Sequence, residues 1–494
     1  MTLLLLALAC NAPIDDSGIG EPDHSGIALR EDGWLRGDLH MHTEHSDGWD
    51  DVATVIALAE YLDSEEFVAF HPEYAGNGLD FIAITDHRMI DAQFDPDYHS
   101  EKLVLVGGEE FGSTGHANLF GVHAFVDHDP DHDGVTLSDY QAAVVATHAQ
   151  GALFSPNHPF LPKIPFPWDI RDHDAIEVWN VGWGLMSPEN TEANLLGWEA
   201  SRGDASPLYW RAMQTTGQGA SMQALTWYEA HLSRGLHVAL VGGSDRHAVL
   251  LPGFPTTWVR ADSVDEDGVV QGIADQHTFV SRTPASAQVL LTIAMDGTRW
   301  EMGDEVPIPA GGAEVEIAVR VGRADGGRLR VVSGSAVATD EALQTAVLGQ
   351  VLLEEDVVGD DHQATTTLSV VPGDWLYPVV LEPLYAEGLT PEQEERVHDV
   401  AVAAVEAADE DFFRLAQVFV DYIPDPEVLT DAQTCDPEDW DPWMLQCLPA
   451  DAEGLASYYL PDWLDRAVNV TTVDYEVTDW CMGAVGSAVR FVSE

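Results

Sequence analysis

The stretch Gly37-Asp38-Leu39-His40-Met41-His42-Thr43-Glu44-His45-Ser46-Asp47-Gly48 is the most informative part of this chain. It places three histidines and two carboxylates between His40 and Asp47, where a short strand is expected to end. His40 and His42 are two positions apart, so on an extended backbone their imidazoles point the same way. Two nitrogen ligands presented like this can bind one metal ion. With 20 histidines in the chain, such a pair also arises by chance, so further ligands have to support it.

Four further segments carry the same chemistry, and most of them follow an expected strand. They are Ile84-Thr85-Asp86-His87, Gly107-Gly108-Glu109-Glu110-Phe111 with Gly115-His116-Ala117-Asn118 after it, Ser155-Pro156-Asn157-His158-Pro159, and Gly242-Gly243-Ser244-Asp245-Arg246-His247. In an α/β barrel the residues at the carboxyl ends of the strands meet on one face. The five segments together therefore predict one site built from imidazoles and carboxylates.

The first half of the chain alternates between short apolar runs and helical patterns, from Gly33 to about Pro284. Strands are expected at residues 81–85, 103–106, 118–122, 152–155, 175–179 and 238–242, and helices at 52–62, 137–150 and 219–234. This alternation is typical of a parallel α/β sheet or barrel. We therefore expect an α/β barrel domain over residues 25–284.

The pattern changes after Pro284. Residues 287–294, 313–321 and 328–332 read as short strands separated by glycine-rich turns, which predicts a smaller antiparallel, β-sandwich-like domain over 285–494. Residues 387–467 are acidic and largely helical in pattern, so we expect a helical insertion there. Residues 479–494 are expected to return as a final strand of the β-rich domain.

The charge of the chain limits its partners. It has 85 acidic and 21 basic residues, only two of which, Lys102 and Lys163, are lysines, and its formal net charge is −64. Nucleic acids and anionic membranes bind basic surfaces, so neither is expected as a partner. A solvated surface in a salty or extracellular setting accounts for this charge better than a general role in binding cations. The sequence does not determine the oligomeric state.

The N-terminus resembles a bacterial lipoprotein signal peptide. A short apolar run over residues 3–9 leads to Cys10, although no basic residue precedes it, and a wrongly assigned start is the alternative. The run is too short to span a bilayer as a helix. We expect export to the cell envelope, a lipid anchor at Cys10 as the only membrane contact, and a tether up to residue 24. Among the other cysteines, Cys435 and Cys447 are the simplest disulfide pair, which leaves Cys481 over.

The predicted ligands indicate the kind of metal. Imidazole and carboxylate ligands without thiolate suit Zn, Mn or Fe and argue against a structural zinc site of the cysteine type. There are enough of them for more than one divalent ion. A carboxylate such as Glu110 can bridge two ions, and the water between them then becomes a hydroxide nucleophile at neutral pH. We therefore expect a metal-dependent hydrolase that acts on a small molecule.

The motifs GDLHMHTEHSDG, ITDH, GEEF with GHAN, NHP and GSDRH, in this order, resemble the PHP (polymerase and histidinol phosphatase) superfamily. The additional segments IEVWN and GFPTTWV are similar to its CehA/McbA-like branch. The resemblance covers residues 33–284 and implies a distorted (β/α)7 TIM-like barrel with a di- or trinuclear metal site. It assigns His40, His42, Glu110 and Asp245 to a first ion, Glu110, His116 and His158 to a second, and Asp47, His87 and His247 to a third.

Several alternatives remain open at this stage. Glu110 is preferred to Glu109 as the ligand, because the family pattern has a bulky apolar residue after the glutamate and neighbouring strand residues face opposite ways. Asp86 either orients a ligand histidine or caps the following turn. Arg246 either binds an anionic group of the substrate or forms an ion pair with nearby carboxylates.

The activity expected first is phosphoester hydrolysis, with Asp245, Arg246 and His247 acting in catalysis. Hydrolysis of a carbamate, ester or amide is the alternative that the CehA/McbA-like branch implies. The strongly negative charge of the chain is unfavourable for an anionic phosphate substrate, although local metal charge can outweigh it. An alternative of another class is a surface lipoprotein that binds metal or a ligand without turnover.

Overall fold

The computed structural model describes residues 33–70, 72–112, 115–130, 136–160, 166, 170–180, 220–247, 251–343, 348–383, 440–441, 446–447 and 480–493. The chain divides into two compact units. In the unit of residues 1–19 and 385–472, the described strands β18 (Trp440–Asp441) and β19 (Gln446–Cys447) pair antiparallel. Cys10 lies outside the described residues, as does the expected helical insertion apart from these two strands.

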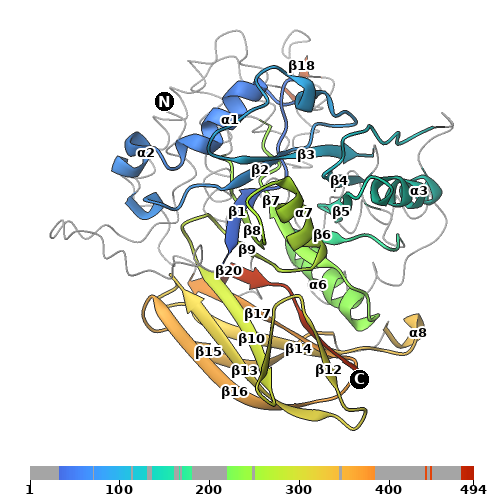
Figure 1. The fold of residues 1–494 in the computed structure, drawn as a ribbon, viewed down its shortest axis with the longest axis vertical. Coiled ribbons are helices and arrows are strands. Elements are labelled where there is room, and N and C mark those ends of the chain that lie inside the picture. The colour runs from blue at the N-terminus through green and yellow to red at the C-terminus, as the bar shows by residue number, and fades with distance from the viewer. Residues whose placement is uncertain are drawn as a thin grey trace. The chain divides into compact units, whose positions relative to one another are not determined.

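The larger unit, residues 20–384 and 473–494, is a mixed α/β fold whose first part carries the predicted ligands (Figure 1). The elements of this part are β1 (Trp34–Asp38), α1 (Val52–Tyr61), α2 (Glu65–Phe70), β2 (Phe81–Ile84), β3 (Val104–Phe111), β4 (His116–Phe120), α3 (Leu137–His148), β5 (Leu153–Asn157), β6 (Ala175–Asn180), α6 (Ala220–Ser233), β7 (Ala239–Gly243), β8 (Thr256–Arg260), α7 (Glu266–Ala274) and β9 (Thr278–Ser281). Short 3-10 helices cover Pro72–Tyr74 and Asp91–Phe94.

The strands of this part pair in both directions. β1, β2 and β3 are parallel neighbours, and β6 and β7 form a separate parallel pair. β4 runs antiparallel between β3 and β5, and β8 runs antiparallel between β1 and β9. The connection from Phe111 to His116 is too short for a crossover, so β3 and β4 can pair only as a hairpin. The sheet is therefore less uniformly parallel than the alternation of elements predicts.

Strands β1 to β8 surround a common hydrophobic core. Each of them contributes at least one buried side chain to a single cluster, and α7 adds Val269 and Ile273. The strand residues are Leu35, Phe81, Ala83, Val106, Phe120, Leu153, Ala175, Ala239, Val241 and Val259. Burial of apolar surface of this extent is the main driving force that holds the strands in place. The core fixes the positions from which the strand ends present the ligands.

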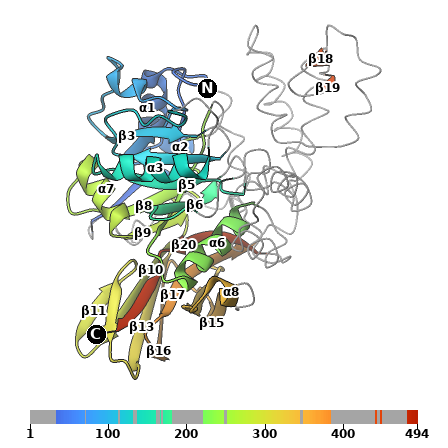
Figure 2. The same cartoon turned by 90° about the vertical axis from the view of Figure 1, so that its right-hand side faces the viewer.

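The second part of this unit is β-rich (Figure 2). Its elements are β10 (Gln288–Met295), β11 (Thr298–Glu301), β12 (Glu305–Ile308), β13 (Ala313–Gly322), β14 (Arg328–Ser335), α8 (Asp340–Leu343), β15 (Gln350–Asp356), β16 (Asp361–Val370), β17 (Asp374–Pro383), β20 (Trp480–Gly486) and β21 (Val489–Ser493). Strands β11, β10, β13 and β16 form one sheet, and β20 hydrogen-bonds both to β17 and to β9. The main sheet thus continues from the first part into the second.

Most expected elements are present with shifted ends. β3 is longer than expected because its glycines, Gly107 and Gly108, continue the ladder instead of ending it. The C-terminal stretch forms two strands, β20 and β21, where a single strand is expected, because its pairing with β17 is interrupted at Ser487 and Ala488; both strands run antiparallel to β17. In the part of the chain that the structure describes, no helix has the length and apolar character needed to cross a membrane.

Two histidines are buried in the core beside α6. His173 and His231 are 4% and 0% exposed, and their ring centroids are 4.9 Å apart. His231 Nδ1 donates to Trp227 O (2.8 Å), and the ring of His173 stacks on that of Trp227. Burial lowers the pKa of His231 to about 4 and places that of His173 well below its usual range. Both side chains are therefore neutral at physiological pH.

This pair should make the protein less stable in mild acid. An unfolded histidine has a pKa of about 6.5, so as the pH falls the unfolded chain takes up the proton first. The free energy of unfolding is therefore highest above about pH 6.5 and decreases as the pH falls toward the folded-state pKa. For His231 alone the loss is about 2 kcal/mol at pH 5. Urea unfolding with chelator at pH 8 and pH 5 measures this loss. His231→Asn keeps a donor for Trp227 and should show a smaller loss; an equal loss would contradict the prediction.

Candidate metal centre

Backbone contacts beyond the ends of the strands bring the ligand-bearing segments side by side. Met41, after β1, forms a parallel bridge with Arg246, after β7. Thr85 N, after β2, donates to Met41 O (2.8 Å), and His87 forms a parallel bridge with Glu110 of β3. The segments that follow β7, β1 and β2 and the end of β3 therefore lie in this order. Each contributes predicted ligands to the same place.

His40 and His42 both point toward the carboxylate of Asp245. The Nε2 atom of each lies 3.2 Å from Asp245 Oδ1, and both side chains are 0% exposed. They point the same way, as their spacing predicts, although both follow the last residue of β1.

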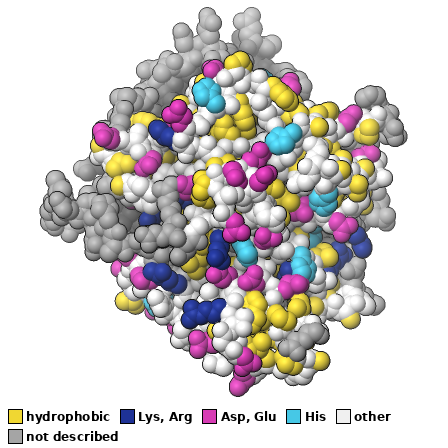
Figure 3. Space-filling model, in the orientation of Figure 1, with side chains coloured by type: hydrophobic (Ala, Val, Ile, Leu, Met, Phe, Trp, Pro, Cys, Tyr) yellow, Lys and Arg dark blue, Asp and Glu magenta, His cyan; other side chains and the backbone are white. Residues whose placement is uncertain are grey.

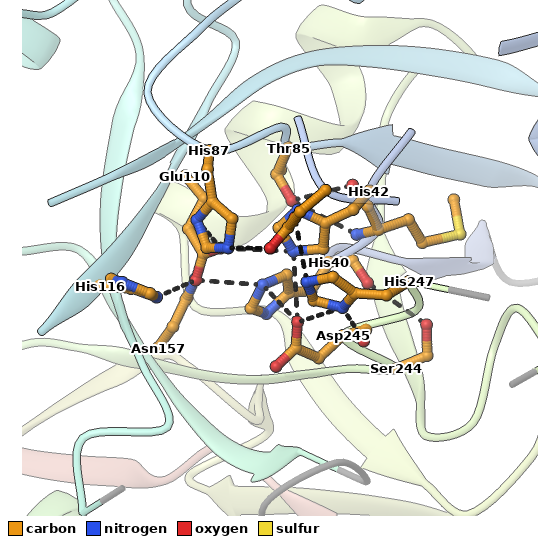
Figure 4. A network of polar contacts seen from close by, with 12 residues as sticks. His40, His42, Thr85, His87, Glu110, His116, Asn157, Ser244, Asp245 and His247 are labelled. Carbon is orange, nitrogen blue, oxygen red and sulfur yellow. Dashed lines mark hydrogen bonds and ion pairs between the residues drawn. The ribbon is translucent and has the colours of Figure 1, made fainter. Parts of the chain in front are cut away.

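The carboxylate of Glu110 lies among the histidines of the centre (Figure 4). Its fully buried carboxylate lies within ion-pair distance of five imidazoles. The distances from Oε1 are 3.2 Å to His40 Nε2, 3.1 Å to His116 Nδ1 and 3.3 Å to His158 Nε2, and those from Oε2 are 3.3 Å to His42 Nε2 and 2.8 Å to His87 Nδ1. Because its two oxygens face different histidines, this carboxylate has the arrangement of a bridging ligand.

A second carboxylate, that of Asp47, lies close to histidines on the more exposed side of the centre. His247 Nε2 lies 3.2 Å from Asp47 Oδ1, and His87 Nε2 lies 3.6 Å from Oδ2. His42 Nδ1 is 3.8 Å from Oδ1. The side chain of Asp47 is 58% exposed, whereas that of Glu110 is 0% exposed. Solvent therefore reaches this side of the centre much more easily.

Two of the ligand positions have an unusual backbone conformation. The φ angles are 51° at Asp245 and 27° at His158, and positive φ is uncommon for residues other than glycine. Such conformations cost free energy and persist where the surroundings enforce them, often at functional sites. Here they turn two side chains inward at the points where β7 and β5 end.

Charge interactions inside the centre outweigh burial. Burial alone would raise the pKa of Glu110, but the imidazoles of His87 and His116 hold it well below its usual range. Burial also opposes ionisation of Asp245, whose pKa the neighbouring His40 lowers well below normal. In turn, Asp245 and Glu110 raise the pKa of His40 well above its usual range against the effect of burial. The proton that His40 holds here is one that a metal ion would replace.

Two of the other imidazoles favour the neutral form. Burial lowers the pKa of His42 to about 3, and that of His116 to about 4. His87 and His247 are different: burial would lower the pKa of each, but Glu110 raises that of His87, and the hydrogen bond with Asp47 raises that of His247 to about 9. Ionised carboxylates beside neutral imidazoles are the protonation state that binds divalent metal ions.

The residues fit a group of divalent ions. His40 Nε2, His42 Nε2 and Glu110 Oε2 are buried and make no hydrogen bond of good geometry within the described residues. Buried polar atoms of this kind are costly unless a partner satisfies them. The structure contains four groups of residues in each of which the ligand atoms lie within 4.8 Å of one another. They are His40, Glu110 and His158 (here the inner group); His42, Asp47, His87 and His247 (the outer group); His40, His42 and Asp245; and His87, Glu110 and His116. All nine predicted ligands occur in them.

The structure shows the contacts of the three residues for which the sequence left alternatives open. Glu109 lies on the other face of β3, where Val126 N donates to it (3.0 Å), so it points away from the centre. Asp86 accepts from Thr43 N (2.7 Å), which fixes the loop after His42. The guanidinium of Arg246 is buried and pairs with Asp50. A role for Arg246 toward substrate stays a prediction.

Residues that support the ligands were missed at the sequence level. Glu177 lies 2.9 Å from His40 Nδ1, and Asn157 Nδ2 donates to Glu110 (3.1 Å). Asp38 accepts from the backbone of His40 and from those of Ser244 and Gly253. A signal existed for Glu177, since a charged residue in the apolar run of β6 has to find a partner.

Comparison with known proteins finds similarity to solved structures only. No family model and no curated protein matches the sequence. The structure is similar to a two-domain protein from Bacteroides vulgatus that contains a predicted PHP-like metal-dependent phosphoesterase, at 15% identity and a TM-score of 0.31, covering 70% of this chain and 90% of that one. It is also similar to the lesion-specific endonuclease PfuEndoQ from Pyrococcus furiosus, at 11% identity and a TM-score of 0.29, covering 56% of this chain and 60% of that one.

A third similar structure is PsfC from Pseudomonas syringae, at 16% identity and a TM-score of 0.27, covering 49% of this chain and 87% of that one. At these TM-scores the activity has to be argued from the residues of the centre.

Proposed function

We propose that this chain is a metal-dependent hydrolase of the PHP type, with a distorted (β/α)7 barrel, and that its substrate is a phosphoester. The observation that carries the proposal is Glu110, a fully buried carboxylate whose two oxygens face five imidazoles. The groups of ligand atoms share members, so ions held by them would be neighbours. Adjacent divalent ions are typical of enzymes that hydrolyse phosphoesters.

Two of the groups of ligand atoms would hold different ions. His40, His158 and Glu110 would hold an inner ion, and the outer group with Asp47 would hold a more exposed one. Divalent ions in such a site lower the pKa of water and stabilise negative charge on the group under attack. The side chains of the inner group are buried away from bulk water, so a substrate would approach the centre from the exposed side at Asp47.

The charge of the chain favours testing a neutral substrate as well. Acidic side chains are spread over the face of the molecule shown in Figure 3, and the net charge is −64. Such a surface repels a phosphate at long range, although screening at physiological ionic strength limits this to about 8 Å. A neutral carbamate, ester or amide meets no such repulsion. It is therefore our second candidate.

Metal analysis combined with a substrate panel tests the proposal. Protein purified without chelator should contain two or three divalent ions per chain and hydrolyse a phosphomonoester or phosphodiester. Chelator should abolish turnover and lower the melting temperature, because an ion that binds only the folded state adds about 2.7 kcal/mol at 100 times its Kd. Turnover of only an aryl ester or carbamate would favour the second candidate. Tight metal binding without any turnover would favour a binding protein.

Export with a lipid anchor at Cys10 belongs to the same proposal. It rests on the apolar run that precedes this cysteine. Labelling with a radioactive fatty acid, compared between the wild type and Cys10→Ala, tests it. Absence of label from the wild type would contradict it.

A further inference from the structure

A buried carboxylate beside the centre belongs to none of the four groups of ligand atoms. Glu177 lies in β6, and 2% of its surface is exposed. Burying a carboxylate is costly unless several hydrogen bonds satisfy it, so its partners indicate what it is for. All of the partners described below belong to the metal centre or lie next to it.

The first oxygen of Glu177 determines which nitrogen of His40 faces the centre. Oε1 lies 2.9 Å from His40 Nδ1, on the opposite side of the ring from Nε2, which faces Glu110 and Asp245. A carboxylate accepts but cannot donate, so it holds the proton on Nδ1 and leaves the Nε2 lone pair for a metal. Carboxylates commonly orient metal-binding histidines in this way.

The second oxygen holds the backbone at His158. His158 N donates to Glu177 Oε2 (2.8 Å), at the position whose φ angle is 27°. This hydrogen bond is one of the interactions that can offset the cost of the unusual conformation. Asn180 Nδ2 donates to the same oxygen (3.0 Å) and lies 3.3 Å from Asp245 Oδ2. Glu177 thus contacts both histidines of the inner group and neither Asp47 nor His247 of the outer group.

We infer that Glu177 is the positioning residue of the inner group. It presents His40 Nε2 and the turned-in His158 to the same ion, and it does not act on the outer group. The inference rests on the proposed metal centre, but not on the reaction that the centre performs.

Asp86 is a buried carboxylate that supports the outer group, as Glu177 supports the inner group. Asp86 is 1% exposed and accepts from Thr43 N and Thr43 Oγ1 (2.7 Å each) and from Ser46 Oγ (2.6 Å). These contacts fix the loop that carries Asp47, and none of them involves His40 or His158. Two substitutions of the same kind, Glu177→Gln and Asp86→Asn, can therefore be compared at the two sides of one centre.

Metal affinity is the measurement that tests the inference. Wild type and variants are stripped of metal and titrated with Zn²⁺ against a competing chelator, and anomalous diffraction from zinc-loaded crystals assigns each ion. Glu177→Gln can turn an amide N–H toward His40 Nδ1 and cannot accept on both sides. It should weaken the ion of the inner group by about 10- to 100-fold and leave the ion at Asp47 unchanged. Asp86→Asn should weaken the ion at Asp47 more than the ion of the inner group.

A third variant separates positioning from a general loss of structure. Glu229 is a carboxylate on α6 that also accepts at both oxygens, from Gly349 N (3.0 Å) and from Tyr377 Oη (2.6 Å), outside the metal centre. Glu229→Gln should leave the affinity for both ions unchanged. If Glu177→Gln fails to fold, Asn180→Ala leaves the carboxylate in place and should weaken the same inner ion by a smaller factor.

Two outcomes would overturn the inference. One is wild-type affinity for the inner ion in Glu177→Gln. The other is an equal loss at both ions in Glu177→Gln and in Asp86→Asn, which is what a merely structural role gives. A wild type that binds Zn²⁺ but hydrolyses no substrate contradicts the proposed function and not this inference, because its readout is affinity.

Discussion

Replacing Glu110 by glutamine should remove metal binding and hydrolysis together. The carboxylate faces five imidazoles through two buried oxygens, and an amide can neither carry the charge nor accept on both sides. The loss of affinity should exceed the roughly 10- to 100-fold cost of losing a residue that only orients a ligand. Metal content after gel filtration and turnover on the best substrate measure both effects.

The neighbouring residue provides the control. Glu109 is also 0% exposed and has the same side chain, but on the opposite face of β3 it interacts with Val126 N. Glu109→Gln should therefore keep its metal ions and its activity. If the two variants lose metal equally, Glu110 is not the bridging ligand that its geometry indicates.

Gly243→Ala should damage the centre without changing any ligand. A Cβ atom at Gly243 would lie 2.3 Å from His40 Cβ and 3.1 Å from His40 N. Neither atom is the flexible end of a side chain, so the added methyl group has to displace the segment that carries His40. Overpacking of this kind costs about 1–3 kcal/mol, and the displacement should also reduce metal affinity. Denaturant unfolding with chelator and a Zn²⁺ titration measure the two effects separately.

Gly311→Ala is the matched substitution for this test. Gly311 is exposed in a turn before β13, and a Cβ atom there meets nothing within 4 Å. Its stability and metal affinity should equal those of the wild type. Wild-type metal affinity in Gly243→Ala would show that the segment after β1 can move without loss of the centre.

The motifs of the sequence predicted which side chains lie together in the described structure, because each motif is local. Each predicted ligand lies in a short motif with a recognisable spacing, such as His40 with His42, and the strands before them are strongly apolar. Strand alternation predicted that only one of Glu109 and Glu110 faces the centre, and the family pattern favoured Glu110. These signals need no knowledge of the partners across the fold.

Supporting contacts could not be predicted, because they join segments far apart in the chain. Glu177 and His40 are 137 positions apart, and Asp38 and Gly253 are 215 positions apart. Such pairs depend on which strands become neighbours, and the sequence alone did not predict that β4 and β8 run antiparallel. The positive φ angles at His158 and Asp245 are set in the same way, by surroundings and not by residue type.

The pairing of β9 with β20 has a consequence for how the protein forms in the cell. Ser487 N donates to Thr278 O (2.9 Å), and Leu240 N donates to Ser487 Oγ (3.4 Å), so Ser487, directly after β20, also binds β7 and β9. Synthesis proceeds at about 5–20 residues per second, and β20 leaves the ribosome long after β9. Until then β9 presents an open edge, which is prone to pair with other chains. The segments from β1 to β7 that carry the ligands are therefore all synthesised before β20 can pair with β9.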